Sequence, residues 1–241
     1  MSDRVVLVTG STSGIGRATA ERFAARGDVV VFNSSRSTAE GARLAAATPG
    51  AHYIQGSVGA EGGAEALIAE VLERCGRLDV LVNNAGTTRA IPHRDLAAAS
   101  REVWREIFEV NVFGTWSMCV AAMEPLTASH GSIVNVGSLA GVRPTGSSIP
   151  YAASKAALHH LTVLLAKTVG PAVRVNAVAP GLVDTPWTAS WARARERAEA
   201  NAPLRRSGKP EDIAEVIVDV AAHAYLTGQV IVVDGGLGLV S

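Results

Sequence analysis

The chain has 241 residues, of which 48% are hydrophobic and 18% charged, and this length and composition suit one large domain with a well-buried core. Its 22 Lys and Arg residues balance its 22 Asp and Glu residues, which excludes a global charge that would attract nucleic acid or an anionic membrane. Two cysteines, Cys75 and Cys119, have neither the spacing of a metal site nor that of a disulfide framework. We therefore predict a single domain that binds a small molecule and holds no metal.

The first residues of the sequence and the lengths of its apolar runs bear on the cellular location of the protein. The segment MSDRVVLVTG reaches a Thr-Gly turn after four apolar residues, which is too few for a secretory signal. Uninterrupted apolar runs stay well below the roughly 18 residues needed to cross a membrane. Together with two cysteines that suit a reducing compartment, these features predict a cytoplasmic protein.

Short runs of β-branched residues alternate with longer alanine-rich segments along the whole chain. The runs predict strands at 5–8, 29–32, 52–55, 78–82, 132–136, 173–178 and 229–233. Helical spacing of apolar residues predicts helices at 17–27, 64–76, 102–116, 154–170 and 210–224. This alternation is typical of a parallel sheet covered on both faces. We expect residues 1–241 to form a doubly wound α/β domain with seven parallel strands.

Residues 182–207 form the least regular segment, which is longer than an ordinary connection between a strand and a helix. Trp187 and Trp191 lie four residues apart within it and could meet on one face of a helix. We expect this segment to be a lid over the substrate, with packing of both indoles in the core as the alternative.

A glycine-rich loop, TGSTSGIG, follows the first predicted strand and leads into a helix. Gly10, Gly14 and Gly16 would permit a tight turn and let backbone amides approach a pyrophosphate, while the helix N-terminus would attract its negative charge. An ordinary turn between a strand and a helix, without a ligand, could also contain glycines. The position of this loop in the first βαβ unit favours a dinucleotide site.

The sequence YAASK places Tyr151 and Lys155 about one helical turn apart, so that in a helix beginning here they would share a face. A nearby ammonium lowers the pKa of a phenol from its usual value of about 10. Such a phenol could exchange a proton with a substrate oxygen. The alternative is a solvent-exposed pair without a catalytic role.

Six motifs occur in a single order along the chain. They are TGSTSGIG, NNAG at 83–86, Asn111 in EVNVFGTW, Ser138 after SIVNVG, YAASK, and PGLVDT at 180–185. Together they resemble the single-domain short-chain dehydrogenase/reductase family over essentially the whole chain. Within this family, the motifs resemble those of 3-oxoacyl-carrier-protein reductases, and they resemble those of sugar, steroid and xenobiotic reductases equally well. The family resemblance implies a Rossmann-type fold, NAD(P)(H) at the carboxyl edge of the sheet, and hydride transfer to or from a carbonyl or alcohol carbon.

The resemblance also implies roles for four residues. Tyr151 would be the general acid in carbonyl reduction and the base in alcohol oxidation, and Lys155 would lower its pKa and hold the nicotinamide ribose. Ser138 would hydrogen-bond and polarise the substrate oxygen. Asn111 would lie in a kinked turn whose carbonyl holds a water of a proton relay, the alternative being an ordinary polar residue in a helix.

Cofactor contacts are implied along the same edge, with Asn83 bracing the sheet beside them. The expected cofactor-binding residues are Gly10, Ser11, Ser13, Gly14, Ile15, Gly16, Asn33, Ser34, Ser35, Arg36, Ser57, Val58, Asn84, Ala85, Gly86, Tyr151, Lys155, Pro180, Gly181, Val183 and Thr185. His159 and His160 receive no role, because a histidine on an amphipathic helix is more often packing or surface.

The end of the second predicted strand bears on the choice of cofactor. NAD enzymes of this type place a carboxylate there to bind the ribose hydroxyls, and it repels a 2′-phosphate. This sequence has Asn33 at the predicted position, followed by Ser34, Ser35 and Arg36, whose guanidinium could bind phosphate. We predict NADP(H), with NAD(H) as the alternative.

Two residues depart from the family pattern around that cofactor. Ser13 stands where NADP-preferring relatives often carry a basic residue, and Ser57 replaces the aspartate that usually meets the adenine. Arg36 is therefore the main feature that favours NADP(H).

We predict an NADP(H)-dependent oxidoreductase that interconverts a ketone and a secondary alcohol. The alternatives are an NAD-dependent alcohol dehydrogenase, a nucleotide-sugar epimerase or dehydratase, and a redox sensor that binds the nucleotide without turnover. Glycine spacing and a chain that ends soon after VVDGG disfavour the epimerase, and the intact Ser138, Tyr151 and Lys155 disfavour the sensor.

Partners follow partly from the resemblance, which implies a homotetramer or homodimer. The helices after TTRAIPHRDL and from YAASK onward are apolar enough to pack against a second copy. An acyl carrier protein is the alternative to a free small substrate. Six basic residues between Arg193 and Lys209 favour it weakly, whereas TASHG and VGPAV lack the Arg or Lys that it would require.

Overall fold

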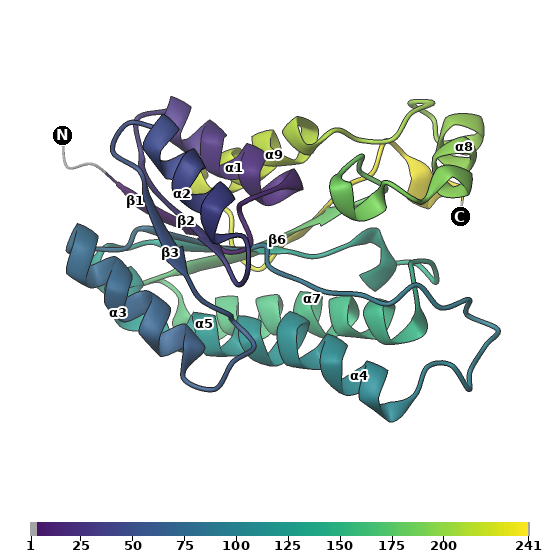
Figure 1. The fold of residues 1–241 in the computed structure, drawn as a ribbon, viewed down its shortest axis with the longest axis horizontal. Coiled ribbons are helices and arrows are strands. Elements are labelled where there is room, and N and C mark those ends of the chain that lie inside the picture. Colours follow the sequence, from purple (N-terminus) through teal and green to yellow (C-terminus); the bar gives the residue numbers. More distant parts are fainter. Residues whose placement is uncertain (1–3, 241) are drawn as a thin grey trace.

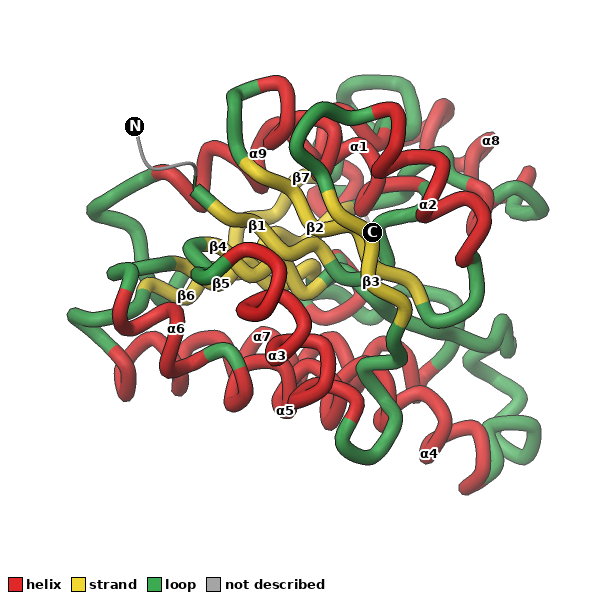
Figure 2. The backbone as a smooth tube through the Cα atoms, turned by 60° about the vertical axis from the view of Figure 1, so that its left-hand side comes forward, coloured by secondary structure: helices red, strands yellow, loops and turns green. Residues whose placement is uncertain are grey.

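The protein is described by a computed structural model that covers residues 4–240. Seven strands form one parallel sheet, as predicted, and their order is β3-β2-β1-β4-β5-β6-β7 (Figures 1 and 2). The strands are β1 (Val5–Val8), β2 (Val29–Ser34), β3 (His52–Gln55), β4 (Val80–Asn83), β5 (Ser132–Val136), β6 (Arg174–Pro180) and β7 (Val230–Val233).

Helices cover both faces of this sheet. They are α1 (Gly14–Ala25), α2 (Thr38–Ala47), α3 (Gly63–Cys75), α4 (Arg101–Phe108), α5 (Thr115–Ala121), α6 (Met123–Ala128), α7 (Ile149–Val169), α8 (Ala192–Asn201) and α9 (Pro210–Ala222). A π-helical turn, η1 (Glu109–Gly114), and three 3₁₀ turns, η2 (Leu139–Gly141), η3 (Pro186–Thr188) and η4 (Leu237–Leu239), complete the set. In Figure 1, α1, α2 and α9 lie above the sheet and α3, α4, α5 and α7 below it.

The five central strands are buried on both faces, which explains why they read as continuous apolar runs, whereas the edge strands β3 and β7 are only partly buried. Alternate side chains supply two separate cores: Leu7 and Leu81 pack with α3, α5 and α7, whereas Val6 and Val82 pack with α1 and α9. Within residues 4–240, no helix has both the length and the apolar content to cross a membrane.

Three local features differ from the sequence-based prediction. The helix α2 was not predicted, because its buried face consists of only Gly41 and Leu44. The predicted helix at 102–116 is interrupted by the π-helical turn η1. The predicted helix at 154–170 begins earlier, at Ile149, where the Ser148 side chain caps its N-terminus.

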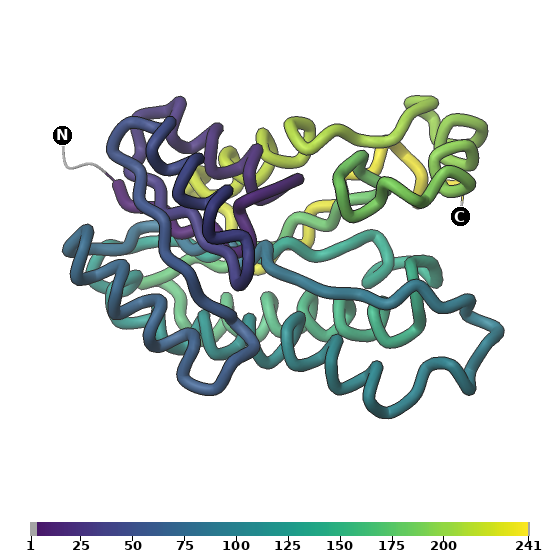
Figure 3. The backbone as a smooth tube through the Cα atoms, viewed as in Figure 1, coloured from purple at the N-terminus to yellow at the C-terminus, as the bar shows by residue number. Residues whose placement is uncertain are grey.

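Because every strand is parallel, the residues that follow the strands meet at one edge. The glycine loop follows β1, NNAG begins at the end of β4, Ser138 follows β5, and PGLVDT begins at the end of β6. This edge lies toward the right in Figure 1, on the side of α8, and Figure 3 traces the 182–207 segment past it.

One predicted cofactor residue is a structural residue instead. Asn33 is only 1% exposed. Its Nδ2 donates to the carbonyls of Ile54 and Gly56, both at 3.1 Å, and its Oδ1 accepts from the Gly10 N–H at 3.2 Å. The strand β2 extends beyond the predicted end, to Ser34, so Asn33 lies inside the sheet and ties it to the glycine loop.

We expect Asn33→Ala to lower the free energy of unfolding by about 2 kcal/mol, because one buried and two partly buried backbone groups would lose their partner. Urea unfolding would measure the change. Asn201→Ala, on the exposed end of α8, is the control and should change stability by no more than about 0.5 kcal/mol. A loss below about 1 kcal/mol for Asn33→Ala would contradict the bracing role.

Candidate active site

Tyr151 and Lys155 lie one turn apart at the start of α7, on one face as predicted. The Ser148 hydroxyl accepts from the Tyr151 N–H at 3.3 Å, which fixes the first turn of the helix. Lys155 is 4% exposed, and its Nζ donates to the Val136 carbonyl at the end of β5, at 2.8 Å. The same Nζ lies 5.8 Å from the centre of the Tyr151 ring.

Burial controls the acidity of both groups. It lowers the pKa of Lys155 to about 8. It raises the pKa of Tyr151, and a hydrogen bond with the Ser138 hydroxyl opposes that rise. The sequence predicted the opposite direction for Tyr151. Desolvation of the phenolate dominates here, because the Lys155 ammonium is directed at the Val136 carbonyl. Tyr151 is therefore a neutral phenol near pH 7, which is the form that donates a proton.

Ser138 follows β5 and caps the short turn η2. Its Oγ accepts from the Ala140 N–H at 3.1 Å, so its O–H proton is free to be donated elsewhere. Since Ser138 also interacts with Tyr151, two hydroxyl donors converge on one place. A carbonyl oxygen could accept from both.

Asn111 lies in the π-helical turn η1, which confirms the predicted irregular turn. Its side chain accepts from the Thr87 N–H at 2.8 Å and donates to the Thr87 carbonyl at 3.0 Å and to the Ser154 hydroxyl at 3.0 Å. Asn111 thus joins the NNAG segment to α7. Thr87 and Ser154 were not singled out from the sequence, because nothing in a sequence pattern pairs them.

The space beside Gly86 is bordered by groups from three segments. A Cβ added at Gly86 would lie 3.3 Å from Asn111 Oδ1, 3.6 Å from Trp187 and 3.8 Å from Lys155 Nζ. The Trp187 indole also packs edge-on against Tyr151, with ring centres 6.3 Å apart. A side chain at position 86 would therefore narrow the approach to Tyr151 and Lys155.

The two predicted lid tryptophans do not share a helical face. Trp187 lies in the 3₁₀ turn η3, and Trp191 is the residue that precedes α8, so a change of backbone direction separates them. Only Trp187 contacts Tyr151.

The glycine loop is a tight turn that only glycine accommodates at several positions. Gly10 and Gly14 have φ angles of 62° and 53°, which favour glycine. Side chains are excluded at Gly16, where a Cβ would lie 2.4 Å from Asn84 Nδ2. Within the described residues, Ser13 makes no side-chain capping bond at the start of α1, so the helix N-terminus is left to bind an anion.

Several other predicted cofactor residues have their polar atoms bonded within the protein. Asn84 donates to the carbonyls of Thr9 and Gly10, and Ala85 lies against Gly10. Ser11 is fully buried and its Oγ accepts from the Asn33 N–H at 2.9 Å. Ser34 is bonded to the Tyr53 hydroxyl at 2.9 Å.

The remaining predicted residues divide into exposed and buried groups. Ser13, Ser35, Arg36 and Ser57 are exposed, Ile15, Gly181 and Thr185 are partly buried, and Val58, Pro180 and Val183 are buried. The Thr185 methyl lies 3.2 Å from the position of a Cβ on Gly14, so PGLVDT adjoins the glycine loop. Val183 packs in the core beneath α9, so only its backbone could meet a ligand.

These features fit an NAD(P) cofactor. The glycine loop and the uncapped start of α1 would hold its phosphates, Ser35 and Arg36 its adenosine ribose, and Lys155 and Gly86 its nicotinamide end. The absence of a side chain at Gly86, where a Cβ would lie within 3.8 Å of Asn111, Trp187 and Lys155, is the observation that supports the nicotinamide end. In the described part of the chain, no three His, Cys, Asp or Glu side chains converge as metal ligands would.

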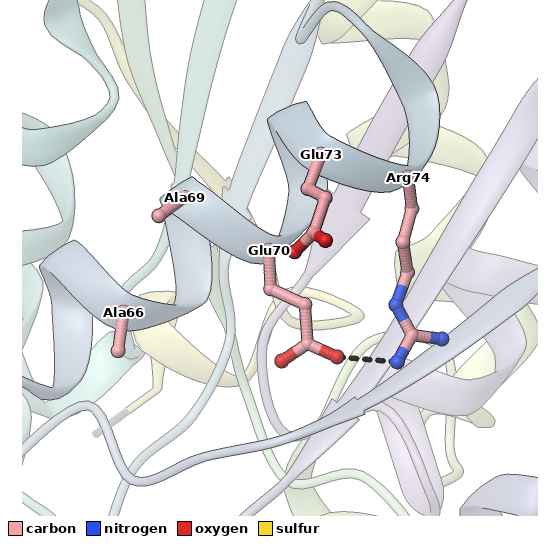
Figure 4. Close-up of a pocket in the computed structure, with 5 residues that line it drawn as sticks. All are labelled: Ala66, Ala69, Glu70, Glu73 and Arg74. Carbon is pink, nitrogen blue, oxygen red and sulfur yellow. Dashed lines mark hydrogen bonds and ion pairs between the residues drawn. The ribbon is translucent and has the colours of Figure 1, made fainter.

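A separate hollow lies on the outer face of α3 (Figure 4). Ala66, Ala69, Glu70, Glu73 and Arg74 line it, and Glu70 pairs with Arg74. Exposed ion pairs of this kind contribute little and suggest an ordinary helix surface. We assign it no function.

Comparisons with known proteins agree with this geometry. A family model described as enoyl-(acyl carrier protein) reductase matches residues 10–238. A Streptomyces violaceoruber protein named ketoacyl reductase 2 of the granaticin polyketide synthase is 56% identical over 239 residues, which cover 98% of this chain and 96% of that protein.

Solved structures show the same fold. A short-chain dehydrogenase/reductase structure from Burkholderia xenovorans has a TM-score of 0.90 and 39% identity, and the match covers 99% of each chain. The RhlG/NADP active-site complex from Pseudomonas aeruginosa has a TM-score of 0.89 and 33% identity, and the match covers 99% of this chain and 97% of that one. The chain therefore belongs to the short-chain dehydrogenase/reductase family of single-domain, NAD(P)-dependent enzymes that act on carbonyl and hydroxyl groups.

Proposed function

We propose that the protein reduces a ketone to a secondary alcohol with NADP(H), and catalyses the reverse oxidation of the alcohol. The observation that carries this proposal is the convergence of Ser138 and Tyr151 above the buried Lys155 at the carboxyl edge. The relative named as a ketoacyl reductase supports a ketone as the group reduced.

Each of these side chains has a distinct task. Bound NADPH supplies the hydride. Tyr151 donates its phenolic proton to the oxygen that gains negative charge, and Ser138 donates a hydrogen bond to the same oxygen. Lys155 holds a positive charge behind the phenol, which stabilises the phenolate once the proton has left. The Asn111 carbonyl accepts from the Thr115 hydroxyl at 3.1 Å, and we assign to the same carbonyl the water of the proton relay.

We expect Tyr151→Phe to lower kcat for ketone reduction by about 10²–10⁴-fold, because it removes the transferable proton and little volume. Cofactor affinity, measured by the quenching of tryptophan fluorescence, should stay within about twofold of the wild-type value. Lys155→Ala should lower both kcat and cofactor affinity, since its ammonium has both roles. An unchanged kcat in Tyr151→Phe would disprove the proposed proton donor.

Exposed residues beyond β2 support NADP(H) as the cofactor. Asn33 and Ser34 are occupied in the sheet, so Ser35 and Arg36 are the exposed residues at its end. Neither is a carboxylate that would repel a 2′-phosphate, and Arg36 can bind phosphate through two nitrogens. The solved RhlG complex, which holds NADP, is a relative with this fold.

We expect the wild-type protein to prefer NADPH to NADH, and Arg36→Ala to lower kcat/KM for NADPH about tenfold or more while changing that for NADH little. Arg43→Ala is the matched control, because Arg43 is an exposed arginine on α2 that is already paired with Glu40 at 2.7 Å. Equal losses with both cofactors, or a wild-type preference for NADH, would refute the assignment.

A free small-molecule ketone is the substrate that we favour over a carrier-bound one. Of the basic residues proposed to attract an acyl carrier protein, Arg195 lies 3.8 Å from Asp184 and Arg206 is paired with Asp212. These pairs weaken the positive field of the segment. Names of the matched family model and of the granaticin relative keep a carrier-bound ketone as the alternative.

We also propose that residues 182–207 cover the substrate, with Trp187 as the part nearest the reaction. Trp187 is 44% exposed although it packs against Tyr151, so one side of the indole is free to contact a ligand.

We propose the cytoplasm as the cellular compartment of the protein. Cys75 and Cys119 are free thiols, which supports a reducing compartment of this kind.

We expect sedimentation at micromolar concentration to give the mass of a dimer or tetramer of 24.9 kDa chains. Exposed apolar side chains from η1, α5 and α7 form the proposed interface, and they are Phe113, Trp116, Val120, Val163 and Leu164. Trp116→Glu with Leu164→Glu should dissociate the assembly, whereas Leu96→Glu, in an exposed loop, should not. A wild-type monomer would contradict the proposal.

A further inference from the structure

The His159 imidazole lies beneath the loop that carries Ser138. His159 follows Lys155 by one turn of α7 and is 7% exposed. Its Nε2 accepts a hydrogen bond from the Ser138 N–H at 3.3 Å, and the ring lies against Gly141, where an added Cβ would lie 2.8 Å from Nδ1. One side chain of α7 thus contacts both ends of the segment from Ser138 to Gly141.

Two glycines beside Ser138 make room for this ring. A Cβ at Gly137 would lie 2.1 Å from His159 Nε2, and a Cβ at Gly141 would lie 2.7 Å from Cε1. Both distances are shorter than non-bonded atoms can adopt, so the loop is shaped around the imidazole. Gly137 is also fixed from the other side, since its N–H donates to the Val178 carbonyl at 2.7 Å.

The protonation state suits these contacts. Burial, with a smaller effect of the Lys155 ammonium, lowers the pKa of His159 to about 4, so the ring is neutral at pH 7. A neutral imidazole carries one N–H. Since Nε2 accepts from Ser138, the proton lies on Nδ1, where it can be donated to the Gly141 carbonyl.

Ser138 depends on its own backbone for orientation. Its Oγ accepts from the Ala140 N–H at 3.1 Å, within the segment that the imidazole holds. A shift of this segment would turn the hydroxyl away from Tyr151 and from the substrate oxygen.

We propose that His159 is a positioning residue for the reaction, which holds the Ser138 backbone so that the Ser138 hydroxyl faces Tyr151 and the substrate oxygen. The inference rests on the proposed ketone reduction and adds to it a residue that acts through Ser138. If His159 only filled space, any side chain of similar shape could replace it without loss of activity. If His159 positions Ser138, its replacement must also accept the hydrogen bond that Nε2 accepts from the Ser138 N–H.

The kinetic test compares His159→Leu, which removes the acceptor, with His159→Gln, whose Oε1 can accept from the same N–H. His159→Leu should lower kcat about 10- to 100-fold, while the KM for NADPH stays within about twofold. His159→Gln should recover most of the loss. His160→Leu, at the exposed next position, is the matched control and should behave as wild type.

A double-mutant cycle separates positioning from packing. If His159 acts through Ser138, then His159→Leu should cost little further activity in a Ser138→Ala background. The proposal is overturned if the two losses multiply, if Leu and Gln are equally impaired, or if His159→Leu keeps kcat within about twofold of wild type.

Hydrogen exchange tests the contact without turnover. Amides of residues 137–141 should exchange faster in His159→Leu than in wild type and in His160→Leu, with unchanged far-UV circular dichroism showing that the fold is intact. Unchanged exchange would overturn the proposal. Failure of wild type to reduce any ketone would instead refute the proposed function, and the exchange result would still decide whether His159 holds the loop.

Discussion

Buried asparagine side chains hold the carboxyl edge of the sheet together, and the site depends on them. Buried amides are costly unless their polar atoms are paired. Asn33 joins β2 to the end of β3 and to the glycine loop. Asn83 bonds Asn135 across β4 and β5 at 2.9 Å, which fits the bracing role that the resemblance implied, and Asn135 bonds Thr162 of α7 at 2.9 Å. These hydrogen bonds fix the segments at the carboxyl edge, which apolar side chains such as valine could not do.

The helix α7 carries a buried lysine, which is an energetically costly feature. Desolvation disfavours the charged form of Lys155, and the Val136 carbonyl at 2.8 Å compensates only in part. The same helix carries Tyr151, Ser154 and His159 on its buried side. Proton donor, cation and loop support therefore move as one rigid body, which is the arrangement that a precise reaction geometry requires.

Glycines decide how closely the segments of the edge approach each other. Gly16 admits the Asn84 amide, Gly137 and Gly141 admit the His159 ring, and Gly86 lets Asn111, Trp187 and Lys155 approach its backbone. The close packing around the site thus arises from one residue type in different surroundings.

The sequence alone determined the sheet, its parallel strand arrangement and the one-turn separation of Tyr151 and Lys155. These rest on local patterns of apolar periodicity and residue spacing, which involve residues close together in the chain. The roles expected for Ser138 and Asn111 came instead from the resemblance of six motifs to a known family. The tertiary structure decided the rest. It showed that Asn33 is a brace, that burial raises the pKa of Tyr151, and that Trp187 and Trp191 lie on separate turns. It also distinguished His159 from its neighbour His160, because burial and pairing with Ser138 depend on contacts between residues that are distant in sequence.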